Sequence, residues 1–106
     1  MMSRVAFRLR VRPDCIEAYE EAHRRVWPEM LQLLKDVGIT QYSIFRRGVD
    51  LFLFLHVDDF ERAWNVLDKH PVNQRWQQAM KPLFEPLTEL EGGERFPMMK
   101  EVFYLE

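Results

Sequence analysis

The chain has 106 residues, of which 47% are hydrophobic and 30% charged, and its formal net charge is -2 at pH 7. This size and balance predict one globular domain over residues 1–106, and so small a domain gains stability from burial against a second subunit. The slightly negative charge argues against nucleic acid as a partner. No apolar run approaches the ~20 residues that cross a bilayer, and the one cysteine, Cys15, cannot form an internal disulfide. We therefore expect a cytoplasmic protein that binds no membrane.

The first predicted elements are a strand and a long helix. Apolar residues alternate with small or basic ones over residues 5–11, which is the pattern of a strand with one buried face. A helix then begins at Pro13 or Asp14, presents an apolar stripe spaced by three and four residues, and ends near Gly38. Pro28 interrupts this stripe because it lacks an N–H, so the helix must bend or restart one turn after His23.

A predicted hairpin follows. Residues 39–46 and 51–57 have strand patterns, and the four residues between them are short enough for a hairpin connection. In the second strand, leucines alternate with Phe52 and Phe54, so both faces of this strand need to be buried.

The last third of the chain contains two predicted helices and a strand. Asp58 or Asp59 caps a helix that runs to about His70, and a shorter helix ends before Pro82. A looser stretch rich in proline and glycine leads to a final strand over residues 100–105.

This order of elements predicts an α+β fold, a ferredoxin-like sandwich with its helices on one face of the sheet. The other face would be bare and apolar in a single chain. Covering it with the sheet of a second subunit would give a homodimer with a dimeric α/β barrel.

Several kinds of site lack support in the sequence. His23, His56 and His70 lie on three separate predicted elements without metal-binding spacing, and the four glycines form no phosphate-binding loop. The two other histidines end a strand and a helix and are best explained as structural. Cys15 has no nearby base, so we interpret it as a small hydrophobic residue. The arginines of the first strand and of the hairpin are expected to be solvated, with a small anionic ligand as the alternative.

Four residues have side chains suited to proton transfer or to stacking on a sugar. Tyr19 and His23 stand four residues apart and therefore share the inward face of the first helix. Tyr42 and Trp76 supply aromatic surface, against which the C–H faces of sugars pack. The spacing is also compatible with four core residues, so the pattern alone does not decide between the two interpretations.

The sequence resembles the L-rhamnose mutarotase family in several segments that occur in the same order and together cover nearly the whole chain. These segments are AYEEAHRRVWPEM, GITQYSIF, RAWNVLDKHPVNQRWQQAM and the terminal EVFYL. The resemblance implies a dimeric α/β barrel isomerase that interconverts the α and β anomers of L-rhamnose without a metal or an organic cofactor. It places His23 on the catalytic proton donor and Tyr19, Tyr42 and Trp76 on sugar-binding positions.

One position departs from the family pattern. Family members can have two adjacent tryptophans where this chain has Trp76 followed by Gln77. Gln77 can hydrogen-bond a sugar hydroxyl but cannot stack on a ring, so L-fucose or another aldose stands beside L-rhamnose as an alternative for the preferred sugar. Two further alternatives are a dimeric α/β barrel monooxygenase and a non-catalytic ligand-sensing or interaction module, because fold alone does not determine function.

Overall fold

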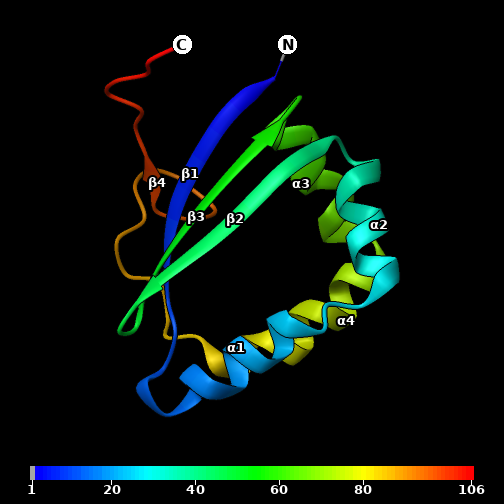
Figure 1. The fold of residues 1–106 in the computed structure, drawn as a ribbon, viewed down its shortest axis with the longest axis vertical. Coiled ribbons are helices and arrows are strands. Elements are labelled where there is room, and N and C mark those ends of the chain that lie inside the picture. The colour runs from blue at the N-terminus through cyan, green and yellow to red at the C-terminus, as the bar shows by residue number, and fades with distance from the viewer. Residues whose placement is uncertain (1) are drawn as a thin grey trace.

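The structure is a computed structural model that describes residues 2–106. Within these residues four strands form one antiparallel sheet in the order β2-β3-β1-β4, and four α-helices cover one of its faces (Figure 1). This strand order is that of a ferredoxin-like sandwich, which confirms the predicted α+β class. The strands are β1 Ser3–Arg10, β2 Ile39–Arg47, β3 Asp50–Val57 and β4 Met98–Met99, and the helices are α1 Ile16–Arg24, α2 Pro28–Asp36, α3 Phe60–Lys69 and α4 Pro71–Met80.

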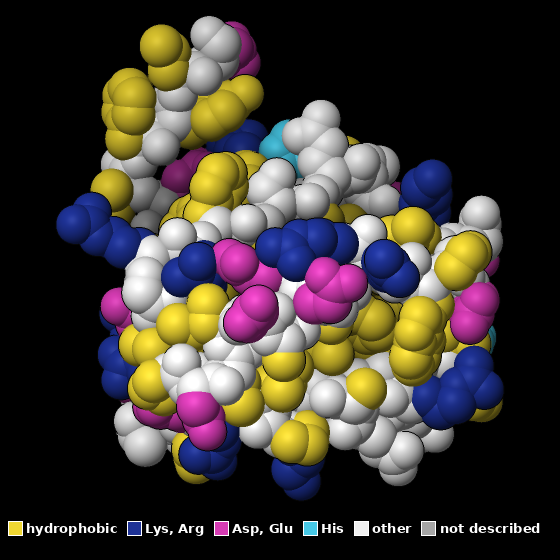
Figure 2. All heavy atoms as spheres, turned by 60° about the horizontal axis from the view of Figure 1, so that its bottom comes forward, with side chains coloured by type: hydrophobic (Ala, Val, Ile, Leu, Met, Phe, Trp, Pro, Cys, Tyr) yellow, Lys and Arg dark blue, Asp and Glu magenta, His cyan; other side chains and the backbone are white. Residues whose placement is uncertain are grey.

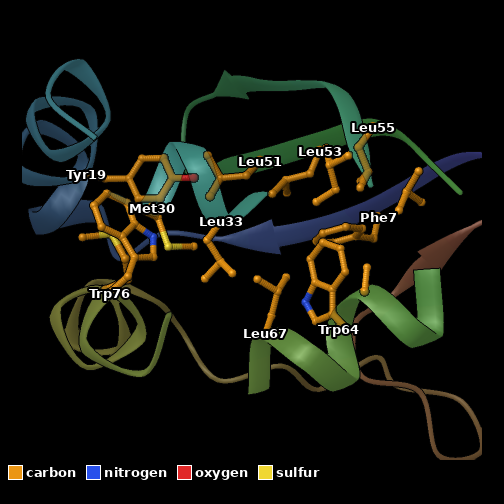
Figure 3. Close-up of a cluster of buried hydrophobic side chains, with 14 of the residues drawn as sticks. Phe7, Tyr19, Met30, Leu33, Leu51, Leu53, Leu55, Trp64, Leu67 and Trp76 are labelled. Atoms are coloured by element: carbon orange, nitrogen blue, oxygen red, sulfur yellow. The ribbon is translucent and has the colours of Figure 1, made fainter. Parts of the chain in front are cut away.

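The core lies between the sheet and the helices. The register of β3 against β1 runs from Ser3 opposite Val57 to Arg10 opposite Asp50. Because side chains alternate along a strand, the leucines of β3 point toward the helices and are buried, whereas its two phenylalanines point to the other face. Figure 3 shows the buried cluster, with Tyr19 and Trp76 at one end and Phe7 and Trp64 at the other.

The predicted break at Pro28 is present. Helix α1 ends at Arg24 and α2 begins with Pro28 as its first residue, after an extended Trp27 with φ -57° and ψ 135°. Proline suits this first position because the N–H it lacks would have no partner inside the helix. The two helices consequently run in different directions (Figure 1), and His23 lies in the last turn of α1, beside the break.

The turns also match the chemistry of their residues. Gly48, with φ +59°, and Val49 form a two-residue connection in the β2–β3 hairpin, so both strands extend one residue beyond the predicted limits. Asp59, and not Asp58, caps α3 by accepting a hydrogen bond from the Arg62 N–H at 3.0 Å. His70 separates α3 from α4, and its Nδ1 accepts from the Val72 N–H at 3.2 Å.

The predicted strand over residues 100–105 is wrong. Pairing with β1 stops after Met98 and Met99, and residues 100–106 have no secondary structure. A strand needs a paired neighbour, and beyond Met99 no backbone pairing with β1 is present. Side chains make the contacts instead: Arg4 binds Glu101 at 2.7 Å and lies over the ring of Tyr104. This segment projects from the body of the molecule with hydrophobic side chains along it (Figures 1 and 2), and Val102 is 88% exposed.

Candidate active site

The structure brings the predicted site residues together at one end of the core. His23 from α1, Tyr42 from β2 and Trp76 and Gln77 from α4 line a cavity of about 230 Å³, here called the aromatic cavity. An adjoining hollow of about 630 Å³ is lined by Tyr19 and shares His23 with the aromatic cavity. His23 therefore lies where the two spaces meet. The first cavity falls just below the ~300–1,000 Å³ range of typical small-molecule sites, a size that suits a very small ligand.

One hydrogen bond determines which nitrogen of the neutral His23 imidazole carries the hydrogen. Its Nδ1 lies 2.8 Å from the backbone carbonyl oxygen of Tyr19, one helical turn earlier. A carbonyl oxygen only accepts, so Nδ1 must carry the hydrogen. In the neutral imidazole Nε2 is then an acceptor, and in the charged ring it is a donor. Nε2 is thus the nitrogen left to exchange a proton with a ligand.

Aromatic rings hold the imidazole in place on two sides. The Tyr19 ring lies 4.2 Å from it, centroid to centroid, and the Trp76 ring meets it edge to face at 5.5 Å. Trp27 in turn packs edge to face on Trp76 at 5.2 Å. Figure 3 shows Tyr19 and Trp76 facing one another from α1 and α4. The two rings restrict the orientation of the His23 imidazole, and no hydrogen bond among residues 2–106 engages its Nε2.

Both tyrosines of the site stay protonated at neutral pH. Burial raises the pKa of the Tyr19 phenol to about 12, because the charged phenolate is poorly solvated there. Burial also raises the pKa of Tyr42 well above its ordinary value, and repulsion from Tyr19 adds to the effect. These hydroxyls are therefore suited to hydrogen-bonding a ligand and not to acting as phenolate bases.

The adjoining hollow, unlike the aromatic cavity, is lined by the charged side chains Glu20, Arg24 and Arg46. Glu20 accepts from Arg46 at 2.7 Å, which ties α1 to β2 beside Tyr19. The aromatic cavity is walled mainly by apolar side chains, namely Val26, Met30, Leu31, Leu34, Ile44, Trp64 and Leu67. A ligand at His23 would thus have apolar surface on one side and charged groups on the other.

Sequence reasoning missed Asn73. This residue is 6% exposed and lines the aromatic cavity beside Trp76 and Gln77. Its Nδ2 donates to the Leu67 carbonyl at 3.0 Å, and its Oδ1 accepts from Gln77 at 3.3 Å. A signal existed in the sequence, because Asn73 stands three residues before Trp76 and seven before Met80, on the buried stripe of α4.

Other features lie outside this site. A more open groove of about 770 Å³, the α4 groove, is also lined by Asn73 and Gln77 but contains none of the four aromatic and histidine site residues. Cys15, His56 and His70 line neither the aromatic cavity nor the adjoining hollow. Among residues 2–106, no three His, Cys, Asp or Glu side chains gather closely enough to hold a metal ion. In the same range no helix is long and apolar enough to cross a bilayer.

The fold and the site define a ferredoxin-like α+β protein with a small aromatic pocket built around one histidine. A sequence model of the family described as L-rhamnose mutarotase matches residues 4–105. The chain therefore belongs to the L-rhamnose mutarotase family, which confirms the resemblance drawn from its sequence segments.

Individual relatives agree with this membership. The chain is 33% identical to the L-rhamnose mutarotase of Oceanobacillus iheyensis over 99% of its length and 100% of that protein. It is 42% identical to the L-rhamnose mutarotase of Leptothrix cholodnii, over 76% of each chain. Among solved structures, the L-rhamnose mutarotase of Formosa agariphila matches with a TM-score of 0.76 and 30% identity, covering 98% of this chain and 99% of the other.

Proposed function

We propose that this protein is an isomerase that interconverts the α and β anomers of L-rhamnopyranose by acid and base catalysis. The observation that supports it most directly is the imidazole of His23, whose Nδ1 is held by the Tyr19 carbonyl at 2.8 Å while Nε2 is left to a ligand. The sugar itself is inferred from the family to which the chain belongs.

Exchange of anomers needs only proton transfers and one reversible bond cleavage. In the proposed reaction, protonated His23 donates from Nε2 to the ring oxygen, and the bond between that oxygen and C1 breaks. The anomeric hydroxyl gives its proton to the oxygen of the neutral Tyr19 phenol while that phenol passes its own proton to water in the adjoining hollow, so no phenolate forms. The open-chain aldehyde rotates about the C1–C2 bond and closes again on the other face, which reverses each transfer. Such general acid–base catalysis typically contributes ~10²–10⁴-fold.

The remaining site residues would bind and orient the sugar. Trp76 offers an aromatic face for the apolar side of a pyranose. Tyr42 lines the same cavity and, as a neutral phenol, can donate to or accept from a hydroxyl. Gln77 adds a carboxamide at the rim. A cavity of about 230 Å³ fits one monosaccharide unit better than a chain of them.

We further propose that the protein is a homodimer. On the sheet face away from the helices, Phe45 is 62% and Phe52 is 38% exposed, and Val102 to Leu105 add apolar side chains beyond the sheet. Exposed apolar side chains gathered on one face in this way are typical of an interface. A second copy packed sheet to sheet would bury it and form the dimeric barrel. The lone Cys15 fits a reducing cytoplasm, which we propose as the compartment.

The test is saturation-transfer NMR between the two anomeric protons of L-rhamnose, with and without the protein. The expected result is an exchange rate that exceeds the spontaneous rate and grows in proportion to protein concentration. L-fucose and other aldoses measured in parallel establish which sugar is preferred. Exchange at the spontaneous rate for every aldose would overturn the proposed activity.

A further inference from the structure

A pair of carboxamide side chains lies where the aromatic cavity meets the α4 groove. Asn73 and Gln77 are one turn apart on α4, and both line the two spaces. Asn73 is buried, whereas Gln77 is exposed at the rim. Burying a carboxamide is costly unless its polar atoms are hydrogen-bonded, so the partners of Asn73 explain why it is tolerated among Trp76 and Met80.

The backbone of α3 determines which way the Asn73 amide points. The Leu67 carbonyl lies near the end of α3, where it accepts from the His70 N–H at 3.1 Å and has a second lone pair left for a side chain. It accepts from Asn73 Nδ2 at 3.0 Å. Since a carbonyl cannot donate, the nitrogen of Asn73 must face Leu67, and its oxygen must face away.

The orientation of the Asn73 carboxamide determines the orientation of the Gln77 carboxamide. Asn73 Oδ1 lies 3.3 Å from Gln77 Nε2, and because Oδ1 accepts only, the Gln77 nitrogen must be on that side. The Gln77 oxygen is thereby turned away from Asn73, and no hydrogen bond among residues 2–106 engages it. Gln77 thus presents one acceptor and one spare N–H in a defined arrangement, which matches the hydroxyl of a sugar.

We infer that Asn73 is a positioning residue that holds the Gln77 carboxamide, and that Gln77 selects the substrate by hydrogen-bonding a ring hydroxyl beside Trp76. This inference rests on the proposed function. The pair would recognise one hydroxyl with both an acceptor and a donor, at a position where a second tryptophan could stack and donate its indole N–H but could not accept. A site built to hydrogen-bond a hydroxyl discriminates strongly against a sugar that lacks it.

The test measures kcat and KM for anomer exchange of L-rhamnose in Gln77→Leu, Asn73→Leu and the double variant. Each single change should raise KM about five- to tenfold, the size of one lost neutral hydrogen bond, and leave kcat nearly unchanged. The double variant should be no worse than the more affected single one, because the two side chains act as a unit. Gln78→Leu, which alters only the α4 groove, is the matched control and should keep the wild-type KM.

Two outcomes overturn the inference while leaving the activity intact. They are an unchanged KM in Gln77→Leu, and single-variant effects that multiply in the double variant, which would mean independent structural roles. Thermal melts separate misfolding of Asn73→Leu from loss of recognition, and Gln77→Leu tests the idea even if Asn73→Leu is unstable, because Gln77 lies at the surface. Wild-type protein without any accelerated exchange would instead overturn the proposed function, and this inference with it.

Discussion

Among the individual residues, the backbone carbonyl of Tyr19 has the most influence on the chemistry of the site. It accepts from Nδ1 of His23 at 2.8 Å, which leaves Nε2 as the reactive nitrogen in both protonation states. The helical spacing of Tyr19 and His23 predicts that they share a face, and it also brings this backbone oxygen within reach of the ring. One turn of helix therefore supplies both the proton carrier and the group that orients it.

The buried tyrosines predict how the protein behaves at high pH. Folding raises the pKa of the Tyr19 phenol from ~10 in the unfolded chain to about 12. The contribution of this residue to the free energy of unfolding is therefore fully present below pH ~10. This stability is lost as pH rises toward 12, up to about 2–3 kcal/mol for Tyr19. Denaturant unfolding at pH 9, 10 and 11 should therefore show a falling free energy of unfolding, and Tyr19→Phe should flatten the fall. Tyr104→Phe, which removes an exposed phenol, is the control, and equal profiles for Tyr19→Phe and wild type would contradict this account.

Asn73 was not predictable as a site residue, although its neighbours were. Tyr19, His23, Tyr42 and Trp76 have side chains that suggest chemistry by themselves. The spacing on α4 signals that Asn73 is buried, but the partner that orients its carboxamide depends on how α3 ends against α4.

At the level of secondary structure, the sequence predicts an element boundary correctly where the backbone geometry of a single residue sets that boundary. Pro28 breaks the first helical region, and Gly48 allows the hairpin turn. The predicted final strand is absent because strand formation depends on a paired edge, which the apolar run of the C-terminal residues cannot reveal. Beyond Met99 that segment has no backbone pairing with β1, and the side chains of Glu101 and Tyr104 contact Arg4.

The cap of α3 allows a direct test at this level. Asp59 accepts from the Arg62 N–H at 3.0 Å, so Asp59→Ala should lower the free energy of unfolding by ~0.5–2 kcal/mol. Asp58→Ala removes a neighbouring carboxylate that does not cap the helix, and it should change stability by less than ~0.5 kcal/mol. Urea denaturation of both variants measures the difference. Equal losses would show that charge near the helix start, and not the cap, is responsible.

For the whole molecule, the distribution of burial is asymmetric. The leucines of β3 are buried under the helices, whereas Phe52, from the same strand, is 38% exposed on the opposite face. The sequence of β3 is apolar on both sides and therefore predicts that both faces of the sheet are buried. It does not specify what packs against the face opposite the helices. The helices cover the first face, and the proposed second copy would cover the other.

The proposed dimer predicts that a charge on the bare face separates the subunits. Wild-type protein should sediment at twice the 12.9 kDa mass of one chain, and Phe52→Glu should sediment as a folded monomer, because a buried unpaired carboxylate is costly. Val66, which is 45% exposed on α3, lies away from this face, so Val66→Glu is the matched control and should remain a dimer. A monomeric wild type at micromolar concentration, or a dimeric Phe52→Glu, would contradict the proposed interface.

The central claim is that the imidazole of His23 transfers the proton that opens the sugar ring. The most direct test compares the rate of L-rhamnose anomer exchange, measured by saturation-transfer NMR, for wild type and His23→Ala at equal concentrations of folded protein. We predict a loss of ~10²–10⁴-fold, with partial recovery when free imidazole is added to the variant. Retention of most of the wild-type rate by His23→Ala would contradict the claim and assign the proton transfer to another group.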